Sequence, residues 1–323
     1  MTFPSCPARL RTAVAAPLAA LGVLALAACA DSDPTATSSE EPGASGASGA
    51  SSETVRIGTA NFPESEIIGQ IWAEALREQG YDVEVTSGIG SREVYISALQ
   101  EGSVTLVPEY AGNLTQFFGD LPEGADETAV RDTLTSVLPE DLAVGEFAPG
   151  ESKDAYRVTR AAADEHGLKT IGDLGKLERV TVAAPPEFAE RPYGPQGLTG
   201  VYGVDASKIT VTPISDGGGP LTVAALVEGK ADAANIYTTS PALRSDGTEA
   251  DLVILEDPKH LIPAQNVVPL YKAGQLPDGA LDAINDIDAA LTTDDLVAMN
   301  LRNVGAERAE PAQIAKDYVA GRK

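Results

Sequence analysis

From residue 55 onwards, the hydrophobic positions of the chain alternate between the spacing of buried strands and the spacing of helices. The run over 55–58 is typical of a short strand, and the apolar residues between 67 and 76 lie on one face of a helix. Alternating valines over 83–85 predict a second strand, residues 91–100 a second helix, and residues 104–107 a third strand. This alternation with short links predicts an α/β fold with a parallel sheet.

One stretch of sequence recurs with the same spacing. Residues 98–110, ALQEGSVTLVPEY, and residues 225–237, ALVEGKADAANIY, share Ala-Leu, one residue, Glu-Gly, seven residues and Tyr. Each copy predicts the end of a helix, a glycine in the left-handed C-cap position and a short buried strand. Ligands of open α/β sheets bind beyond the carboxyl ends of the strands. The repeat therefore predicts two similar lobes that offer Tyr110 and Tyr237 to a shared cleft; the alternative is a chance match between two helix–strand units.

The remaining segments continue the alternation. We expect a helix near 127–138, a strand near 155–159, and helices between 278 and 319 that cover the first lobe. Further elements are expected in the second lobe: a short helix over 169–174, strands over 180–183, 209–214 and 252–255, and a helix over 221–228. The glycine-rich loop 216–220 either binds an anion through its backbone amides or forms a simple tight turn.

The first 54 residues are typical of an exported protein. Two arginines precede an apolar run, 13–28, that has the length of a signal peptide. The run ends in Leu-Ala-Ala-Cys29, which resembles the lipobox of bacterial lipoproteins. This resemblance implies a signal peptide over 1–28, lipidation of Cys29 and an extracytoplasmic protein anchored to the cell membrane. An ordinary signal peptide with an incidental cysteine is the alternative. Residues 29–54, rich in Ser, Gly, Ala and Pro, are expected to form a flexible tether.

Composition limits the possible functions. The formal net charge of −25 over 323 residues, with no balancing basic stripe, disfavours nucleic-acid binding and mildly favours cationic ligands. The two histidines, His166 and His260, lack metal-ligand spacing to another histidine or cysteine, and no nucleophile motif is visible. The sequence therefore predicts no cofactor, no metal and no enzyme activity.

Several motifs together carry a resemblance to a known family. They are NFPESEIIG at 61–69, PEYAGN at 108–113, LKTIGDL at 168–174, PEFAERPYGPQGL at 186–198, IYTTS at 236–240, LEDPKHLIP at 255–263 and LTTDDLVAMN at 291–300. From Val55 to its end, the chain resembles the substrate-binding lipoproteins of osmoprotectant ABC importers, the glycine betaine/choline/carnitine type. The resemblance implies a two-lobe periplasmic-binding-protein fold of type II, with lobe one over 55–155 and 257–323 and lobe two over 156–256.

The resemblance also implies a set of binding residues. The family holds a quaternary ammonium group in a box of aromatic side chains and a ligand carboxylate with polar donors. Transferred position by position, the box residues are Tyr110, Tyr156 and Tyr237, and the carboxylate partner is Arg191. For Tyr95, Tyr193 and Tyr202, packing or surface exposure is at least as good an interpretation as ligand contact.

The sequence departs from the family at several of these positions. Ala60 replaces a frequent lysine, and Gln265 or Asn266 stands near the place of a fourth box tyrosine. The candidate set is completed by Asn61, Asn113 and Gln265. A box with these amides is expected to be more polar than that of a glycine betaine specialist.

The leading hypothesis is a monomeric solute-binding lipoprotein that delivers a small quaternary-ammonium or zwitterionic solute to an ABC permease and its ATPase. Ergothioneine or another small polar solute is an alternative ligand for the same fold. An exported enzyme or a ligand sensor on this scaffold is a further alternative, because a fold does not fix a function.

Overall fold

The computed structural model describes residues 54–122 and 124–322. These residues belong to one compact unit, Gly49–Lys323. The predicted signal peptide, Cys29 and all of the predicted tether except Thr54 lie outside the described residues. Within the described part of the chain, no helix combines the length and the hydrophobicity that crossing a bilayer requires.

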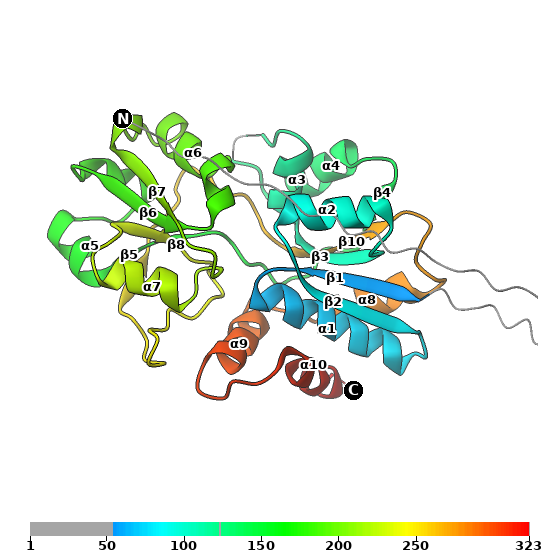
Figure 1. Ribbon diagram of the computed structural model, residues 1–323. Helices are drawn as coiled ribbons and strands as arrows, with labels where there is room; N and C mark the ends of the chain where they lie inside the picture. The colour runs from blue at the N-terminus through cyan, green and yellow to red at the C-terminus, as the bar shows by residue number, and fades with distance from the viewer. Residues whose placement is uncertain (1–53, 123, 323) are drawn as a thin grey trace, which may run out of the picture. The chain divides into compact units, whose positions relative to one another are not determined.

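The first lobe is built on a five-stranded sheet in the order β2-β1-β3-β10-β4 (Figure 1). Its strands are β1 (Val55–Ala60), β2 (Val83–Gly90), β3 (Leu106–Tyr110), β4 (Leu142–Val144) and β10 (Val267–Lys272). β1 runs parallel to β2 and β3, as the sequence predicts, whereas β10 runs antiparallel to β3 and β4.

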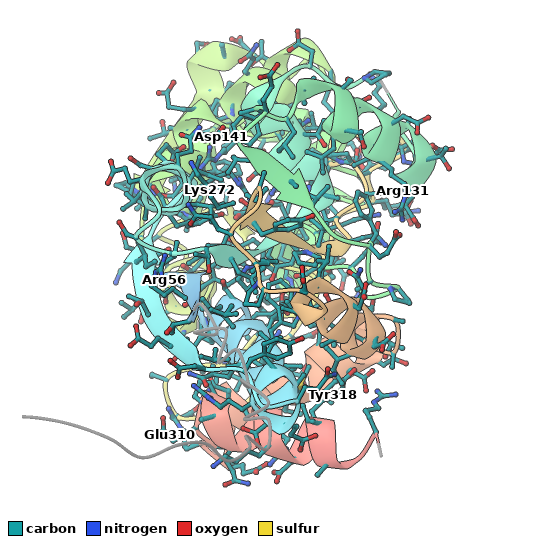
Figure 2. All side chains as sticks on the ribbon, turned by 90° about the vertical axis from the view of Figure 1, so that its right-hand side faces the viewer. Arg56, Arg131, Asp141, Lys272, Glu310 and Tyr318 are labelled. Carbon is teal, nitrogen blue, oxygen red and sulfur yellow. The ribbon has the colours of Figure 1, made fainter. Side chains whose placement is uncertain are left out.

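A surface ion pair supports the edge of this sheet. Lys272, at the end of β10, places its Nζ atom 2.9 Å from a carboxylate oxygen of Asp141, just before β4 (Figure 2). The same Nζ donates to the backbone oxygen of Gln100 at 2.6 Å. These contacts connect the edge strand, the central sheet and the end of a covering helix.

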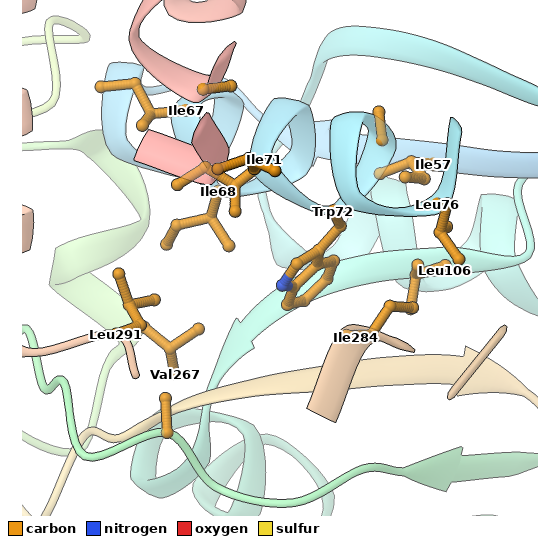
Figure 3. Close-up of a cluster of buried hydrophobic side chains, with 14 of the residues drawn as sticks. Ile57, Ile67, Ile68, Ile71, Trp72, Leu76, Leu106, Val267, Ile284 and Leu291 are labelled. Carbon is orange, nitrogen blue, oxygen red and sulfur yellow. The ribbon is translucent and has the colours of Figure 1, made fainter. Parts of the chain in front are cut away.

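Seven helices within the described residues belong to the first lobe: α1 (Pro63–Glu78), α2 (Arg92–Glu101), α3 (Ala111–Phe118), α4 (Glu127–Val137), α8 (Ala280–Asp288), α9 (Thr293–Val304) and α10 (Pro311–Ala320). The apolar face of α1 is buried, and Trp72 lies at its centre with Leu106 and Ile284 nearby (Figure 3). Helices α8, α9 and α10 pack on α1, which confirms that the tail covers the first lobe.

The second lobe repeats the architecture of the first. Its sheet has the order β7-β6-β8-β5-β9, with β6 parallel to β7 and β8, and β5 antiparallel to β8 and β9. The strands are β5 (Tyr156–Thr159), β6 (Val180–Ala184), β7 (Ile209–Pro213), β8 (Ala233–Asn235) and β9 (Leu252–Ile254). Its helices are α5 (Arg160–His166), η1 (Ile171–Lys176), η2 (Pro186–Glu190), α6 (Pro195–Gly200), η3 (Ala206–Lys208) and α7 (Pro220–Val227).

The repeated sequence occupies equivalent places in the two lobes. Gly102 and Gly229, which follow α2 and α7, have φ angles of 78° and 70°, so both glycines adopt the predicted left-handed conformation. Tyr110 is the last residue of β3, and Tyr237 follows β8 by two residues. The repeat therefore corresponds to a real structural repeat of helix, strand and tyrosine.

The chain crosses between the lobes twice, from β4 to β5 and from β9 to β10. The second crossing comes later than the boundary predicted at residue 257. Leu261 and Ile262 pack in the core of the second lobe, and Ala264 is the first residue of this stretch that packs against the first lobe. The carboxylate of Asp257 explains this, because it accepts the backbone N–H groups of Leu261 at 3.0 Å and Ile262 at 2.8 Å and folds the segment back.

A buried carboxyl group makes the stability of the first lobe depend on pH. Trp72 Nε1 donates to Asp288 Oδ1 at 2.7 Å, and burial raises the pKa of Asp288 to about 8. Between the usual aspartate pKa and about 8, the folded state binds more protons at this group than the unfolded state does. The free energy of unfolding should therefore fall by about 2 kcal/mol between pH 6 and pH 8 and change little above that range.

Urea denaturation at pH 6, 7 and 8, followed by the fluorescence of the single tryptophan, measures this slope. Asp288→Asn is the matched control, since it keeps a polar group beside Trp72 but cannot titrate. The slope assigned to Asp288 should disappear in the variant, and an equally steep slope in both proteins would refute the assignment.

Candidate ligand-binding site

Residues of both lobes line one cavity at the carboxyl ends of the central strands, with about 900 Å³ of space that is partly open to solvent. Of the candidates named from sequence, five line the cavity: Asn61, Tyr110, Asn113, Arg191 and Tyr237. Tyr156 and Gln265 do not line it.

An aromatic cluster connects the two tyrosines of the repeat. The ring of Phe62 lies 5.4 Å from the ring of Tyr237 and 6.1 Å from that of Tyr110, measured between centroids. Phe62 precedes Pro63 at the start of α1, so the helix start fixes its position. Phe62 was not among the site residues predicted from the sequence, although the NFPE segment that contains it carries part of the family resemblance.

A glycine allows the second lobe to approach this cluster. Gly217 lines the cavity with a φ of +62°, and a Cβ atom at this position would lie 3.1 Å from Cβ of Phe62. A larger residue would therefore be strained and would crowd the ring.

A hydrogen bond to a buried carboxylate holds the side chain of Tyr110. Its hydroxyl donates to Glu64 Oε1 at 2.6 Å, while Glu64 Oε2 accepts from Thr239 Oγ1 at 2.6 Å and from Asn300 Nδ2 at 2.5 Å. Burial raises the pKa of the Tyr110 phenol well above its usual value, so the hydroxyl stays protonated and able to donate. Glu64 connects α1 and α9 to the segment that follows Tyr237.

The backbone of Tyr237 is held by an arginine of β5. The Arg157 guanidinium donates to the carbonyl oxygens of Tyr237 at 2.5 Å and Ser240 at 3.0 Å. Burial lowers the pKa of Arg157 to about 10, which still leaves it charged at neutral pH. No hydrogen bond of the Tyr237 hydroxyl is seen within the described residues, so its ring rather than its hydroxyl is the group fixed at the cavity.

A buried ion pair lies under the first-lobe wall of the cavity. Arg92 Nε and one of its terminal nitrogens donate to the two oxygens of Glu109 at 2.7 and 2.9 Å. The same carboxylate accepts the Tyr95 hydroxyl at 2.7 Å and the backbone N–H of Tyr110 at 2.9 Å. Glu109 is fully buried and Arg92 nearly so. This network fixes the end of β3, whose last residue is Tyr110.

A second carboxylate, from the first crossing segment, belongs to the cavity lining itself. Asp154 is 4% exposed and accepts Asn113 Nδ2 at 2.8 Å and Asn235 Nδ2 at 3.1 Å. Burial raises the pKa of Asp154, while hydrogen bonds from Asn113, Asn235 and Tyr193 and the charge of Arg92 oppose this shift. Asp154 was not predicted as a site residue. Its only signal in the sequence was its place two residues before Tyr156.

Gln265 acts on the cavity through Asn113. It is fully buried, its Oε1 accepts the backbone N–H of Asn113 at 3.0 Å, and its Nε2 donates to Asn113 Oδ1 at 2.5 Å. With Oδ1 occupied in this way, the amide nitrogen of Asn113 is directed at Asp154. Gln265 is therefore a positioning residue rather than a lining residue.

Tyr193 lies where Tyr156 was expected. Tyr156 is fully buried, packs edge-on against Phe188 with centroids 5.8 Å apart, and donates its hydroxyl to the carbonyl oxygen of Tyr193 at 2.6 Å. Tyr193 lines the cavity, and its hydroxyl lies 3.4 Å from Asn113 Nδ2. Tyr156 thus belongs to the core of the second lobe and supports Tyr193 from behind.

Arg191, the residue predicted to bind a ligand carboxylate, already forms an ion pair within the protein. Arg191 lines the cavity, but one of its terminal nitrogens lies 2.9 Å from Glu93 Oε1, on α2 of the other lobe. This ion pair spans the mouth between the lobes. Asn61, by contrast, is an exposed residue of the lining.

One amide of the glycine-rich loop and two amides at the start of α7 are occupied by a carboxylate of the loop itself. The carboxylate of Asp216 accepts the backbone N–H groups of Gly219 at 3.1 Å, Leu221 at 2.7 Å and Thr222 at 3.2 Å. The loop therefore caps α7 with its own carboxylate. Of the two interpretations of the sequence, the tight turn is the one the structure supports.

Metal-dependent chemistry has no candidate centre in the described residues. Across 54–122 and 124–322, no group of three or more His, Cys, Asp or Glu side chains is arranged to hold a metal ion. His166 and His260 do not line the cavity. What the cavity offers chemically is aromatic surface, amide donors and carboxylates.

Comparison with known proteins places this geometry in a family. The model of the substrate binding domain of ABC-type glycine betaine transport systems matches residues 53–321. The glycine-betaine-binding protein of Pseudomonas aeruginosa is 27% identical over 285 residues, which cover 84% of this chain and 88% of that protein.

Solved structures confirm the two-lobe, type II periplasmic-binding-protein fold. The crystal structure of a glycine betaine/carnitine/choline ABC transporter has a TM-score of 0.63 at 21% identity and covers 83% of this chain and 98% of its own. A choline-binding protein of an ABC transporter, in complex with choline, has a TM-score of 0.61 at 12% identity and covers 84% and 89%.

The family match spans both lobes and the cavity between them. The chain therefore belongs to the family of substrate-binding domains of ABC-type glycine betaine transport systems, and it is a substrate-binding protein rather than an enzyme.

Proposed function

We propose that this protein captures a small quaternary-ammonium or zwitterionic solute, of the glycine betaine, choline and carnitine class, and delivers it to an ABC permease and its ATPase. The observation that carries the proposal is the cluster of Phe62, Tyr110 and Tyr237 at the cavity, with ring centroids 5.4 and 6.1 Å apart. The relatives named for glycine betaine and choline support the same ligand class.

The chemistry of the ligand explains why rings are needed. A trimethylammonium group carries a positive charge but no N–H group, so it cannot replace its lost water by hydrogen bonding. The faces of aromatic rings attract such a cation by about 0.5–2 kcal/mol each when the site is desolvated. Phe62, Tyr110, Tyr193 and Tyr237 supply this surface from both lobes.

Delivery to a permease requires that ligand binding shift the two lobes from an open to a closed arrangement. Because the first lobe supplies Phe62 and Tyr110 and the second supplies Tyr193 and Tyr237, a ligand that contacts all of them binds the closed arrangement better than an open one. The ion pair of Arg191 with Glu93 adds a contact between the lobes at the cavity mouth. A permease can then recognise the closed form.

We further propose that the protein is held at the cell membrane by lipidation of Cys29, at the end of its Leu-Ala-Ala-Cys motif. Metabolic labelling with a fatty acid tests this, and a label that persists in Cys29→Ser would contradict it.

The ligand class is tested by calorimetric titration of the compact unit Gly49–Lys323. The panel is choline, glycine betaine, carnitine, ergothioneine and the uncharged isostere of choline in which a tert-butyl group replaces trimethylammonium. At least one quaternary ammonium compound should bind with a Kd of about 1 μM or below, which corresponds to a binding free energy of about −8 kcal/mol.

The uncharged isostere should bind choline's site about 100-fold more weakly than choline if ring–cation attraction dominates. Equal affinity for both would contradict an aromatic cation box. Binding of ergothioneine alone would assign the amide-rich wall of the cavity, including Asn113 and Asn235, to a more polar solute.

A further inference from the structure

Together with the ion-pair partners of its arginines, the cavity has more negatively charged than positively charged side chains. Both arginines of the lining are committed to glutamates, Arg92 to Glu109 and Arg191 to Glu93. Two further carboxylates, Asp154 and Glu187, line the cavity, and neither forms a salt bridge with a residue in the described ranges. With all groups ionised, these two arginines and four carboxylates therefore carry an excess of two negative charges.

Asp154 is the more consequential of these two carboxylates because it is buried. Its hydrogen-bond donors, Asn113 and Asn235, are neutral amides, whereas Glu187 is partly exposed and so is screened by solvent. Burying an ionised carboxylate costs free energy unless a positive charge lies nearby to compensate it. The surrounding residues supply hydrogen bonds to Asp154 but no ion pair within the described ranges, and the one arginine whose charge acts on it, Arg92, is paired with Glu109.

The electrostatic effect of Asp154 reaches the aromatic cluster. After burial, the charge of Asp154 is the largest influence that raises the pKa of the Tyr237 phenol, and Arg92 acts in the opposite direction. The carboxylate thus acts on the same space that the rings of Tyr237 and Phe62 surround. A cation placed over these rings would gain attraction from the carboxylate as well as from the ring faces.

We propose that Asp154 selects the net charge of the ligand, so that the cavity favours a cation such as choline over a zwitterion with the same head group, such as glycine betaine. This proposal rests on the proposed function, because it assumes a quaternary-ammonium ligand. Both compounds would place trimethylammonium against the rings and gain attraction from Asp154. Only glycine betaine would also bring a carboxylate into a cavity with excess negative charge.

The carboxylate of a zwitterionic ligand also needs a positively charged donor in the cavity. Arg191 could serve a ligand carboxylate only by sharing or leaving its contact with Glu93. Arg92 is held on both oxygens of Glu109. The charge of each arginine is therefore already compensated by a glutamate, so a ligand carboxylate would meet no uncompensated guanidinium in the lining.

The test is a comparison of choline and glycine betaine affinities, by calorimetry, in the wild type and in Asp154→Asn. The wild type should bind choline at least about tenfold more tightly than glycine betaine. In Asp154→Asn this ratio should fall by about tenfold or more, because choline loses its counter-charge while glycine betaine is relieved of repulsion. The ratio is independent of any loss of folded protein, since both ligands are measured on the same sample.

Glu190→Gln is the control, since it removes one negative charge from an exposed residue of η2, outside the cavity lining. Its ratio should stay within about threefold of the wild type. Asp154→Glu keeps the charge and should retain a preference for choline.

Two outcomes overturn the proposal in different ways. If both ligands bind the wild type and the ratio is unchanged in Asp154→Asn, the charge-selecting role is wrong while the proposed function stands. If no quaternary ammonium compound of the calorimetric panel binds the wild type, the proposed function itself fails, and with it the role of Asp154.

Discussion

Replacing Tyr237 by leucine is expected to weaken the binding of a trimethylammonium solute by about 10- to 30-fold, or about 1.4–2 kcal/mol. Tyr237 lies in the cavity with its ring 5.4 Å from that of Phe62, so its face is placed to contact a ligand cation. Leucine retains apolar bulk but has no π-system. Calorimetric titration with the tightest ligand of the panel measures the loss.

Tyr237→Phe provides the control for this substitution. It keeps the ring and removes only the hydroxyl, which makes no hydrogen bond with a described residue, so affinity should stay within about fivefold of the wild type. A loss as large in the phenylalanine variant as in the leucine variant would assign the effect to the hydroxyl. Unchanged affinity in both would remove Tyr237 from the binding site.

Replacing Arg92 by methionine is expected to lower the free energy of unfolding by about 3–5 kcal/mol. The reason is the charge left behind, because Glu109 is fully buried and loses two charge-assisted hydrogen bonds of 2.7 and 2.9 Å. Denaturation in urea, followed by the fluorescence of Trp72 in the same lobe, measures the change.

Two further variants separate charge from packing. Arg160→Met breaks an exposed ion pair with Asp251 and should cost less than about 1 kcal/mol. Adding Glu109→Gln to Arg92→Met removes the uncompensated charge and should recover a substantial part of the loss. A loss below about 1 kcal/mol in Arg92→Met alone would mean that the buried pair does not stabilise the first lobe.

The sequence predicted the elements that depend on local pattern and backbone chemistry. The apolar spacing around Trp72 requires a helix with one buried face, and a glycine after each repeated Ala-Leu-x-Glu supplies the left-handed turn that ends a helix. Since these signals depend on neighbours in the chain, they predicted β1, α1, β2, α2 and β3 of the first lobe and the five strands of the second, but not α3, β4 or β10. They also predicted the places of Tyr110 and Tyr237, because a residue at the end of a parallel strand lies at the ligand-binding edge.

Signals that depend on distant residues were not available from the sequence. Successive side chains of a strand point to opposite faces, and the pattern around Tyr156 does not show which face is the core. The structure directs Tyr156 into the core and Tyr193 into the cavity. The role of Gln265 depends on two hydrogen bonds to Asn113, 152 residues away in the chain.

Asp154 was missed for a related reason. In an acidic chain most carboxylates are solvated, so one more aspartate carries no signal until its burial and its amide partners are known. The commitments of Arg191 to Glu93 and of Arg92 to Glu109 also cross long sequence separations. The ligand class could thus be inferred from motifs, whereas the charge balance of the cavity required the fold.

The central claim is that a quaternary ammonium group binds between the lobes, over the rings of Phe62 and Tyr237. A crystal structure of Gly49–Lys323 with the tightest quaternary ammonium ligand of the calorimetric panel tests it most directly. The ligand nitrogen should lie within about 6 Å of both ring centroids, and the ligand should contact residues of both lobes. A ligand nitrogen bound outside this cavity, or held by one lobe without contact to either ring, would contradict it.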